Sequence, residues 1–437
     1  MTRFAILAIL PAISVFAIEA RVVAEEEVYT YTNPNNGSGP MWSFGCTPVA
    51  RVGDRVFVSE METGEGVPRL CNTRWRLRER TAAGWKVVAE TPEYKQREPT
   101  ILTTNAKDRL FLYVNTSLMP PGTEYGPCEP HLLAFTLKDN PPVPVKYTPT
   151  WDGKTKYTDH SYRGYAADAV AQRILMFNID AETSIQHFCL LTMDGNPIAN
   201  GSVTFPVRAC YPQVAVENNR AHILAVGDIV EPVEEWRKFK HDQTGQAWDY
   251  VFRRLFYARN EDAERGKFAE PIEIANVDAT AGSISNQDLW IAPNGDAYIM
   301  YTELEVGSAL MRDKFFPGKS TVPSLNLAIV RDGAIAERHV LMPRSDTEHT
   351  GHARFHVTAN GDVFALLYIS GPNPRNELIR IFPKVDAQNR VPVPFKAPFG
   401  SFLLANTRSG NAPSNTIDLV GPGANPNTMA YGQIVAE

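Results

Sequence analysis

The chain has 437 residues and a formal net charge of −6, and 21% of its residues are charged. Phosphate binding needs an excess of basic residues, so this balance argues against nucleic acid as the main partner. Hydrophobic residues make up 43% of the chain, which is ample for a packed core. The 33 prolines and 29 glycines suit a protein of many short strands and turns.

The first 24 residues differ in character from the rest. Arg3 is followed by an apolar run from Phe4 to Ile18, and small residues precede the acidic segment that begins at Glu25. This pattern predicts a secretory signal peptide over residues 1–24, cleaved after Ala24 or Ala20. A membrane anchor is the alternative, but the run contains Pro11 and is shorter than the roughly 20 residues that a span needs. We expect a secreted or periplasmic protein without a membrane association after the leader is removed.

One pattern recurs along the chain: a β-prone segment, a short polar turn, and a second run rich in apolar residues. Asn-Gly turns, as at Asn294–Gly295 and Asn360–Gly361, are strong hairpin signals because both residues accept positive φ. The second runs are apolar enough to be buried on both faces. Six such hairpins are predicted, over residues 47–59, 99–114, 165–177, 211–226, 288–301 and 354–368.

A second hairpin follows most of these. Trp75 to Arg80 alternates polar and apolar residues before a turn at Ala83–Gly84, and residues 131–147, 187–196 and 325–333 contain similar pairs. Such alternation indicates strands with one solvent-exposed face. Two hairpins per unit make a four-stranded blade.

These units predict an all-β fold, a β-propeller of seven four-stranded blades, with six as the alternative count. The seventh blade combines residues 417–434 with the N-terminal segment from Val28 to Thr32, which closes the ring. Residues 25–437 then form a single domain. A β-sandwich of this length would need two domains, and no linker divides the chain; a β-helix would show shorter, more regular coils.

The repeat resembles the sialidase-type, or BNR-repeat, propeller superfamily, which includes propeller polysaccharide lyases and glycosidases. The likeness covers most of residues 25–437 and rests on the blade pattern. The Asp-box of that superfamily, Ser-x-Asp-x-Gly-x-Thr-Trp, is absent, as is the Phe-Arg-Ile-Pro segment of true sialidases. The resemblance therefore implies a carbohydrate-active propeller without pointing to sialidase activity itself.

Polar and aromatic residues stand where the innermost strands begin. These starts converge around the central channel of a propeller, and purely structural positions would favour small or apolar residues. Each has a structural alternative, such as an ion pair, an aromatic corner or a turn cap. The expected catalytic residues are Glu98, Tyr162, Arg163, Tyr211, Asp288, His352 and Arg354, with Tyr165, Gln287 and His356 as substrate-binding residues.

Long loops are expected on the same face, over residues 116–130, 228–250 and 303–323. Long ordered loops in compact folds are usually functional. Trp236 beside Arg237 could stack on a sugar ring and hold an acidic group. The alternative is an amphipathic helix over residues 233–239 that covers the edge of a blade.

Two enzymatic schemes and one binding scheme fit these residue types. A lyase acting on an acidic polysaccharide needs a cation to neutralise a uronate, supplied by Arg163 or Arg354, and a base and an acid from His352 and Tyr162 or Tyr211. A glycosidase would use two carboxylates, for which Glu98 and Asp288 are the best pair, or a tyrosine nucleophile with its partner, as in sialidases. A non-catalytic propeller that binds a glycan or a protein remains the alternative, because many functions share this fold.

No nucleotide-binding, nucleophile-elbow or zinc signature is present. We therefore expect no cofactor, apart from a calcium ion that could fill the channel. The five cysteines allow two disulfides and one free thiol, without specifying the pairs. We expect a monomer whose partner is an acidic glycan.

Overall fold

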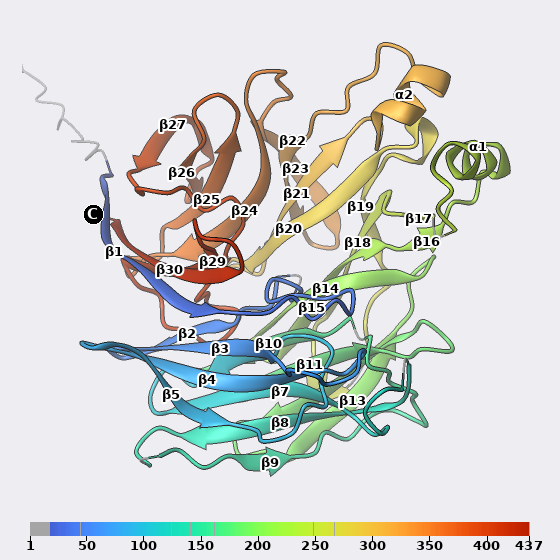
Figure 1. Cartoon of the computed structure of the whole chain (residues 1–437). Coiled ribbons are helices and arrows are strands. Elements are labelled where there is room, and N and C mark those ends of the chain that lie inside the picture. The colour runs from blue at the N-terminus through green and yellow to red at the C-terminus, as the bar shows by residue number, and fades with distance from the viewer. Residues whose placement is uncertain are drawn as a thin grey trace, which may run out of the picture.

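The computed structural model describes residues 18–436, apart from positions 44, 124, 140, 161, 248 and 266. Within that part of the chain, seven antiparallel sheets of four strands are arranged around a central axis as a β-propeller (Figure 1). The predicted fold class and blade count are confirmed. No helix of the described residues is long and apolar enough to span a bilayer.

The seven blades follow one another along the chain, and the strands of each blade are named from the innermost to the outermost. Blade one consists of β2 (Val49–Val52), β3 (Arg55–Thr63), β4 (Thr73–Thr81) and β5 (Gly84–Glu90), and blade two of β6 (Ile101–Thr104), β7 (Arg109–Ser117), β8 (Cys128–Thr136) and β9 (Val145–Tyr147). Blade three consists of β10 (Gly164–Asp168), β11 (Arg173–Ile179), β12 (Gln186–Thr192) and β13 (Pro197–Val203). Blade four consists of β14 (Ala209–Glu217), β15 (Arg220–Gly227), β18 (Arg254–Asn260) and β19 (Ile272–Asn276). Blade five consists of β20 (Ser283–Ile291), β21 (Ala297–Leu304), β22 (Ser324–Arg331) and β23 (Ala334–Met342). Blade six consists of β24 (His349–Val357), β25 (Val363–Ser370), β26 (Arg375–Phe382) and β27 (Asp386–Val393). Blade seven consists of β28 (Leu403–Leu404), β29 (Thr416–Pro422), β30 (Thr428–Ala436) and β1 (Ala20–Thr30).

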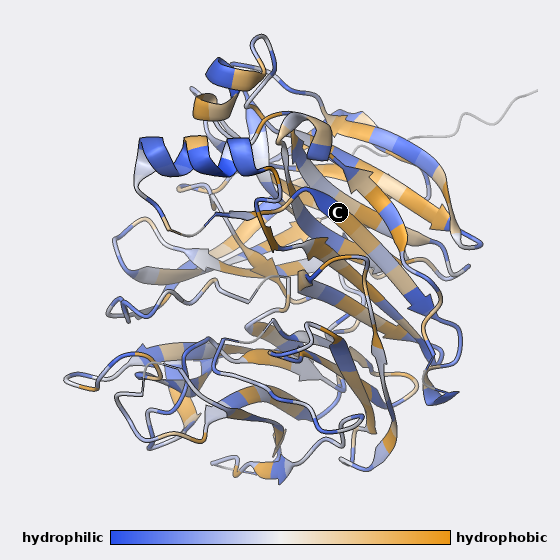
Figure 2. Cartoon of the chain, turned by 90° about the vertical axis from the view of Figure 1, so that its right-hand side faces the viewer, coloured by the Kyte–Doolittle hydropathy of each residue, from blue (hydrophilic) through white to orange (hydrophobic). Residues whose placement is uncertain are grey.

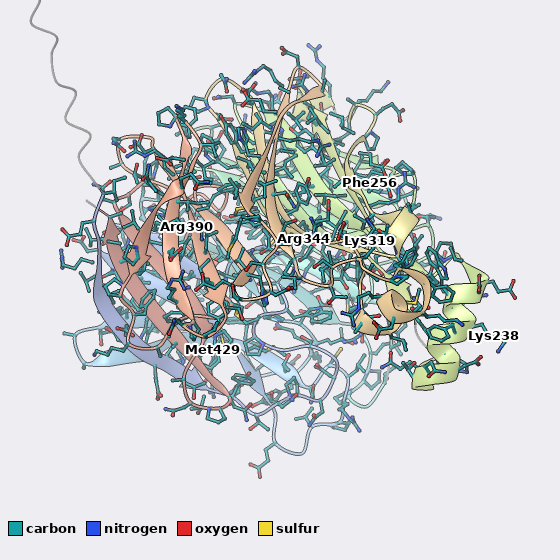
Figure 3. The ribbon with its side chains drawn as sticks, turned by 90° about the horizontal axis from the view of Figure 1, so that it is seen from above. Lys238, Phe256, Lys319, Arg344, Arg390 and Met429 are labelled. Atoms are coloured by element: carbon teal, nitrogen blue, oxygen red, sulfur yellow. The ribbon has the colours of Figure 1, made fainter. Side chains whose placement is uncertain are left out.

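Two insertions project from this framework. Blade four carries β16 (Ile229–Val230), α1 (Glu234–Thr244) and β17 (Tyr250–Val251) between its second and third strands. Blade five carries α2 (Ala309–Phe315) at the equivalent place. Short 3₁₀ turns occupy Ala263–Arg265 and Asp278–Thr280. Figure 3 shows Lys238 of α1 at one edge of the molecule, with α2 beside it.

The two ends of the chain meet in blade seven. β1 pairs antiparallel with β30 from Ala20↔Ala436 to Thr30↔Thr428, so the first described strand is the outermost strand of the last blade (Figure 1). Innermost strands of consecutive blades also contact each other, and β28 contacts β2. The ring is therefore closed by backbone hydrogen bonds between strands far apart in the sequence.

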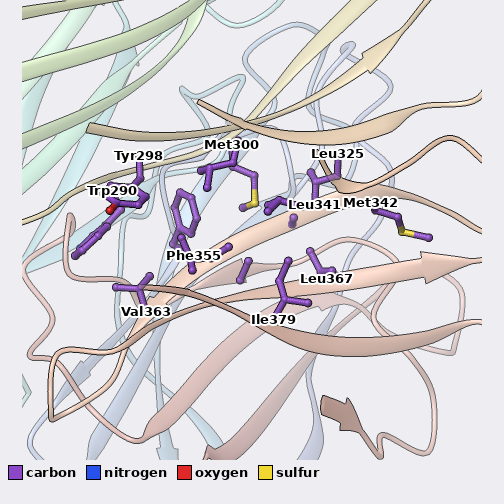
Figure 4. Packing of buried hydrophobic residues seen from close by; sticks show 14 of the residues in the cluster. Trp290, Tyr298, Met300, Leu325, Leu341, Met342, Phe355, Val363, Leu367 and Ile379 are labelled. Carbon is purple, nitrogen blue, oxygen red and sulfur yellow. The ribbon is translucent and has the colours of Figure 1, made fainter. Parts of the chain in front are cut away.

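Apolar faces of neighbouring blades pack against each other. Between blades five and six, Trp290, Met300 and Leu325 from one sheet meet Phe355 and other residues from the next (Figure 4). Each large apolar side chain buried in this way contributes about 1.5–3 kcal/mol relative to exposure. This packing explains why the second strand of each blade is almost wholly apolar.

Outer strands show the predicted alternation (Figure 2). In β4, Trp75 and Leu77 are buried, whereas Arg74 and Arg76 pair with glutamates of β3 and β5. A strand whose side chains alternate in this way presents one face to the core and one to solvent.

A segment that follows β28, residues 405–411, crosses the channel and plugs it. The peptide N–H groups of Thr104 and Ala167, from blades two and three, donate to the carbonyls of Ser409 and Arg408, both at distances below 3 Å. Gly410 has φ 80°, and a Cβ there would overlap the carbonyl oxygen of Thr104, so this close crossing requires glycine.

The Arg408 side chain extends the plug to further blades. Its guanidinium pairs with Asp288 at 2.5 Å and donates to the carbonyls of Val214 and Gly45 at 3.0 and 3.1 Å. The other oxygen of Asp288 accepts from the Phe355 N–H at 2.8 Å. One buried ion pair therefore connects the last blade to the blades on the opposite side of the ring.

The predicted signal peptide lies largely outside the described residues, but Ala20–Ala24 form the beginning of β1. Cleavage after Ala20 would leave almost all of the pairing with β30, whereas cleavage after Ala24 would remove the partners of Gln433 to Ala436. If the predicted signal peptide is cleaved, we expect the remaining chain to begin at Arg21, as read by intact mass. A mature chain beginning at Glu25 would contradict this expectation.

Arg408→Met should destabilise the protein strongly, because it leaves the Asp288 carboxylate buried without its cation. Breaking a buried pair in this way costs about 3–5 kcal/mol. Urea unfolding would measure the loss. Arg55→Met, which removes a half-exposed partner of Glu79, should cost much less. Equal losses in the two variants would show that the plug does not hold the ring.

Candidate functional site

Bulges reshape three innermost strands near their starts. The register shifts between Cys210 and Gln213 in β14, between Asn286 and Asp288 in β20, and between His349 and His352 in β24. Bulges re-aim side chains and are over-represented beside active sites. We call the side of the ring where innermost strands begin the strand-start face.

Tyr211 lies within the first of these bulges at φ 54°. Positive φ is costly for an aromatic residue, of order 1–3 kcal/mol, and persists only where surrounding contacts enforce it. Here the Asn286 side chain donates to the Tyr211 carbonyl at 2.8 Å, and the ring packs on Phe252 with centroids 5.6 Å apart. Strain of this kind is typical of functional sites.

A hydrogen-bonded series links blades two, three and four on the strand-start face. His160 Nδ1 lies 3.2 Å from Oε1 of Glu98, and His160 Nε2 lies 2.8 Å from the Tyr162 hydroxyl. With Nδ1–H donated to the carboxylate, Nε2 accepts the proton of Tyr162. The Tyr211 hydroxyl in turn donates to that of Tyr162, and the two rings meet edge to face at 4.7 Å.

These groups line a small pocket at the axis. Its walls are Trp42, Ser43, Glu98, Ile101, Tyr162, Arg163 and Tyr211. The Trp42 ring lies 6.1 Å from that of His160 and 6.5 Å from that of Tyr211. Glu98 is the one carboxylate among the described residues of this lining.

Two arginines flank the tyrosines, and they differ in how much of their side chains is exposed. Arg163 is almost fully buried, with Nη2 donating to the Pro99 carbonyl at 2.7 Å and lying 3.4 Å from Glu98. Arg208 keeps 30% of its side chain exposed and pairs with Asp228 at 2.6 Å. Its guanidinium lies over the rings of Tyr162 and Tyr250, at 5.2 and 5.8 Å.

Burial controls the protonation of the tyrosines. It raises the pKa of Tyr162 to about 12 and raises that of Tyr211 further. Both hydroxyls therefore keep their protons at neutral pH and are available as acids. The pKa of Arg208 is raised by the nearby Asp228 and Cys210 groups against the effect of burial, so its positive charge is secure.

Other predicted residues form a second layer deeper in the channel. Gln213 Nε2 donates to the carbonyls of Asn286 and Gln287, which places this layer beneath Tyr211. Arg354 donates to the Gln287 carbonyl at 2.6 Å, and the Asp288 carboxylate forms an ion pair with Arg408. Gln287, Asp288 and Arg354 thus converge with one another, but none of them lines the pocket: Gln287 lies within the β20 bulge, and Asp288 and Arg354 follow the bulges of β20 and β24.

The two predicted histidines of β24 face blade seven. His352 Nε2 and His356 Nε2 each lie 2.6 Å from a carbonyl oxygen, of Phe402 and Ser414. Burial lowers the pKa of both rings, and the Arg354 charge lowers that of His352 further. Period-two alternation correctly put them on one face, but that face is the inter-blade contact.

The remaining predictions fall outside the pocket. Tyr165 is buried in the core, with its ring 5.5 Å from that of Tyr113. Trp236 lies on α1, as in the helical alternative, and packs on Phe316, which directly follows α2, with ring centroids 5.4 Å apart, and under the Arg253 guanidinium at 5.2 Å. Arg237 is exposed on α1.

Three residues of the site were not predicted from the sequence to be functional: Trp42, His160 and Arg208. Arg208 immediately precedes β14 and His160 lies shortly before β10, the kind of position that identified Glu98 and Tyr162, whereas Trp42 lies farther upstream of β2. His160 stands two residues before Tyr162, so a histidine in a strand-start segment should have been weighed equally with one inside a strand.

No group of three or more His, Cys, Asp or Glu residues in the described part of the chain is placed to hold a metal ion. The five cysteines are free thiols in the structure.

Solved structures share this fold at very low sequence identity. An ulvan lyase of polysaccharide lyase family 25, bound to -[GlcA(1-4)Rha3S]-, matches with a TM-score of 0.58 and 8% identity over 93% of this chain and 95% of the lyase. A second structure titled as that lyase gives a TM-score of 0.57, with the same identity and coverage. The Penicillium chrysogenum α-L-arabinanase gives 0.43 and 9% identity over 95% and 98% of the two chains.

The neighbours are thus propeller polysaccharide lyases and arabinanase-type glycosidases. This chain has their fold. No protein-family model and no curated protein sequence matches it. A fold shared at this identity does not establish an activity, so the chemistry has to be argued from the site.

The Tyr162 hydroxyl should ionise only near pH 12, in keeping with its buried position and raised pKa. Ring ¹³C NMR of tyrosine-labelled protein, with Tyr162→Phe to assign the resonance, would measure this titration. Ionisation near the ordinary tyrosine value of about 10 would show that the pocket is open to bulk water.

Proposed function

We propose that this protein is an exported polysaccharide lyase that cleaves an acidic glycan at the strand-start face by β-elimination. The observation that carries the proposal is the hydrogen-bonded series from Glu98 through His160 and Tyr162 to Tyr211, with Arg208 beside it. The two tyrosines line the pocket, and His160 and Arg208 contact Tyr162, so a proton acceptor, a proton donor and a cation lie next to one another.

The alternative of glycoside hydrolysis is less well supported. The two carboxylates expected to perform it do not share the pocket, because Asp288 is buried in the layer below and neutralised by Arg408. Glu98 is bound by His160 and Arg163. A hydrolase needs an acid and a second carboxylate on opposite sides of one bond.

The proton acceptor in this proposal is Tyr162 acting with His160. As the bond between C5 of the uronate and its hydrogen breaks, the Tyr162 oxygen takes that proton while its own proton passes to His160 Nε2. The Glu98 carboxylate stabilises the imidazolium that results. This relay avoids a free tyrosinate, whose formation is costly at a pKa of about 12.

The proton donor is Tyr211. The electron pair left at C5 forms the C4–C5 double bond and expels the glycosidic oxygen from C4, which takes the Tyr211 proton. Tyr211 recovers a proton from Tyr162, and Tyr162 recovers one from His160, so no tyrosinate remains and all three residues return to their starting state. The strained backbone of Tyr211 holds its hydroxyl beside that of Tyr162. Acceptor and donor therefore lie on the same side of the sugar, as a syn elimination requires.

Arg208 neutralises the uronate carboxylate and so lowers the barrier to removing the neighbouring proton. Arg163, the neutraliser expected from the sequence, has its donors committed to backbone carbonyls and Glu98, so it positions the carboxylate of Glu98 instead. Trp42 is placed to stack on a sugar ring.

The substrate class follows from this chemistry. Elimination needs an acidic proton next to a carboxylate, which uronic-acid residues provide, and the neighbouring ulvan lyase was captured with a glucuronate-containing repeat. We therefore propose a uronate-containing polysaccharide as the substrate and a location outside the cytoplasm, where such polymers occur.

Incubation with ulvan, alginate and polygalacturonate should reveal turnover of one polymer as ultraviolet absorbance from the new double bond. His160→Gln, Tyr162→Phe and Tyr211→Phe should each lower kcat by roughly 10²–10⁴-fold, the usual contribution of a general acid or base. Tyr298→Phe, a matched change in the blade-five core, should leave kcat unchanged.

Reducing ends that appear without ultraviolet absorbance would show hydrolysis instead. Retention on a polymer without turnover would favour the binding-only alternative. Full activity of Tyr211→Phe would disprove the assigned proton donor.

A further inference from the structure

The Arg354 guanidinium is incompletely bonded in the deeper layer of the channel. Its hydrogen bonds to described residues come from Nη1, which donates to the Gln287 carbonyl, the Ala353 carbonyl and the Gln287 side chain. Nε is buried without a hydrogen-bond partner among the described residues. Only 7% of the residue is exposed. A buried charged donor left unbonded is expensive, so something absent from the protein should satisfy it.

The charges of this layer do not balance. Arg354 and Arg408 carry two positive charges, and Asp288, 1% exposed, carries one negative charge. Glu98 and Arg163 nearby neutralise each other. The other titratable groups are uncharged, because burial raises the pKa of the Cys46 thiol and lowers that of His352. Burial beside Arg408 lowers the pKa of Arg354 to about 10, so it remains a cation at neutral pH.

We propose that the channel binds one small monovalent anion, of the halide class, against Nε of Arg354. The ion would be held between the bulged strands β20 and β24 and would neutralise the excess positive charge. A calcium ion, considered from the sequence, would be repelled by the same two arginines.

The ligand has to be small. Arg354 is almost fully buried and does not line the pocket formed by Trp42 and the two tyrosines, so the expected ligand is a small ion rather than a sugar carboxylate. The anion site is therefore separate from the proposed catalytic groups, and it stands whether or not the protein is a lyase.

Crystals of the wild-type protein soaked in sodium bromide test the site directly. We expect an anomalous bromine peak within hydrogen-bonding distance of Arg354 Nε. Water alone at that position, or no density there, would overturn the proposal.

A solution experiment tests the site without a crystal. At constant ionic strength, replacing gluconate with chloride should raise the melting temperature of the wild-type protein, because a ligand that binds only the folded state stabilises it. Arg354→Met should lose this chloride-dependent rise. Arg51→Met, which removes a cation already matched by Asp418 at 2.5 and 2.6 Å, should retain it. A wild-type melting temperature that does not change with chloride would overturn the proposal.

Discussion

The ion pair between Arg408 and Asp288 at the axis is the interaction on which the rest of the ring depends. A propeller whose innermost strands surround a channel must fill that channel with something whose polar groups are satisfied. This protein uses a segment of its own last blade, and Arg408 bonds to groups from three further parts of the ring. Because β1 completes blade seven from the other end of the chain, the plug and the strand closure reinforce each other.

Filling the axis in this way has a consequence for the strand-start face. The plug closes the deeper channel, so the polar strand starts above it form the floor of a shallow pocket rather than the walls of a tunnel. Bulges in β14, β20 and β24 then turn side chains across the axis. The strained Tyr211 is held there by Asn286 of the next blade, so a structural bond between blades also positions a reactive hydroxyl.

The insertions of blades four and five support the same face. Trp236 packs between α2 and Arg253, and Arg253 pairs with Glu231, whose carboxylate also binds Lys240. This buried network fixes the loop that carries Tyr250 against Arg208. Trp236, which the sequence suggested for stacking on a sugar, packs against these neighbours, and the exposed ring of this insertion belongs to Tyr250.

The all-β fold, the hairpins and the polar rim of strand starts could be predicted from the sequence, because alternation and Asn-Gly turns act over a few neighbouring residues. Glu98, Tyr162, Arg163 and Tyr211 were also identified as members of that rim. Which polar residues meet depends on the folded arrangement of the blades. His352 and His356 bond to the next blade, Asp288 is taken up by Arg408, and His160 completes the series, because these outcomes depend on bulges and on contacts between residues that are remote in the chain.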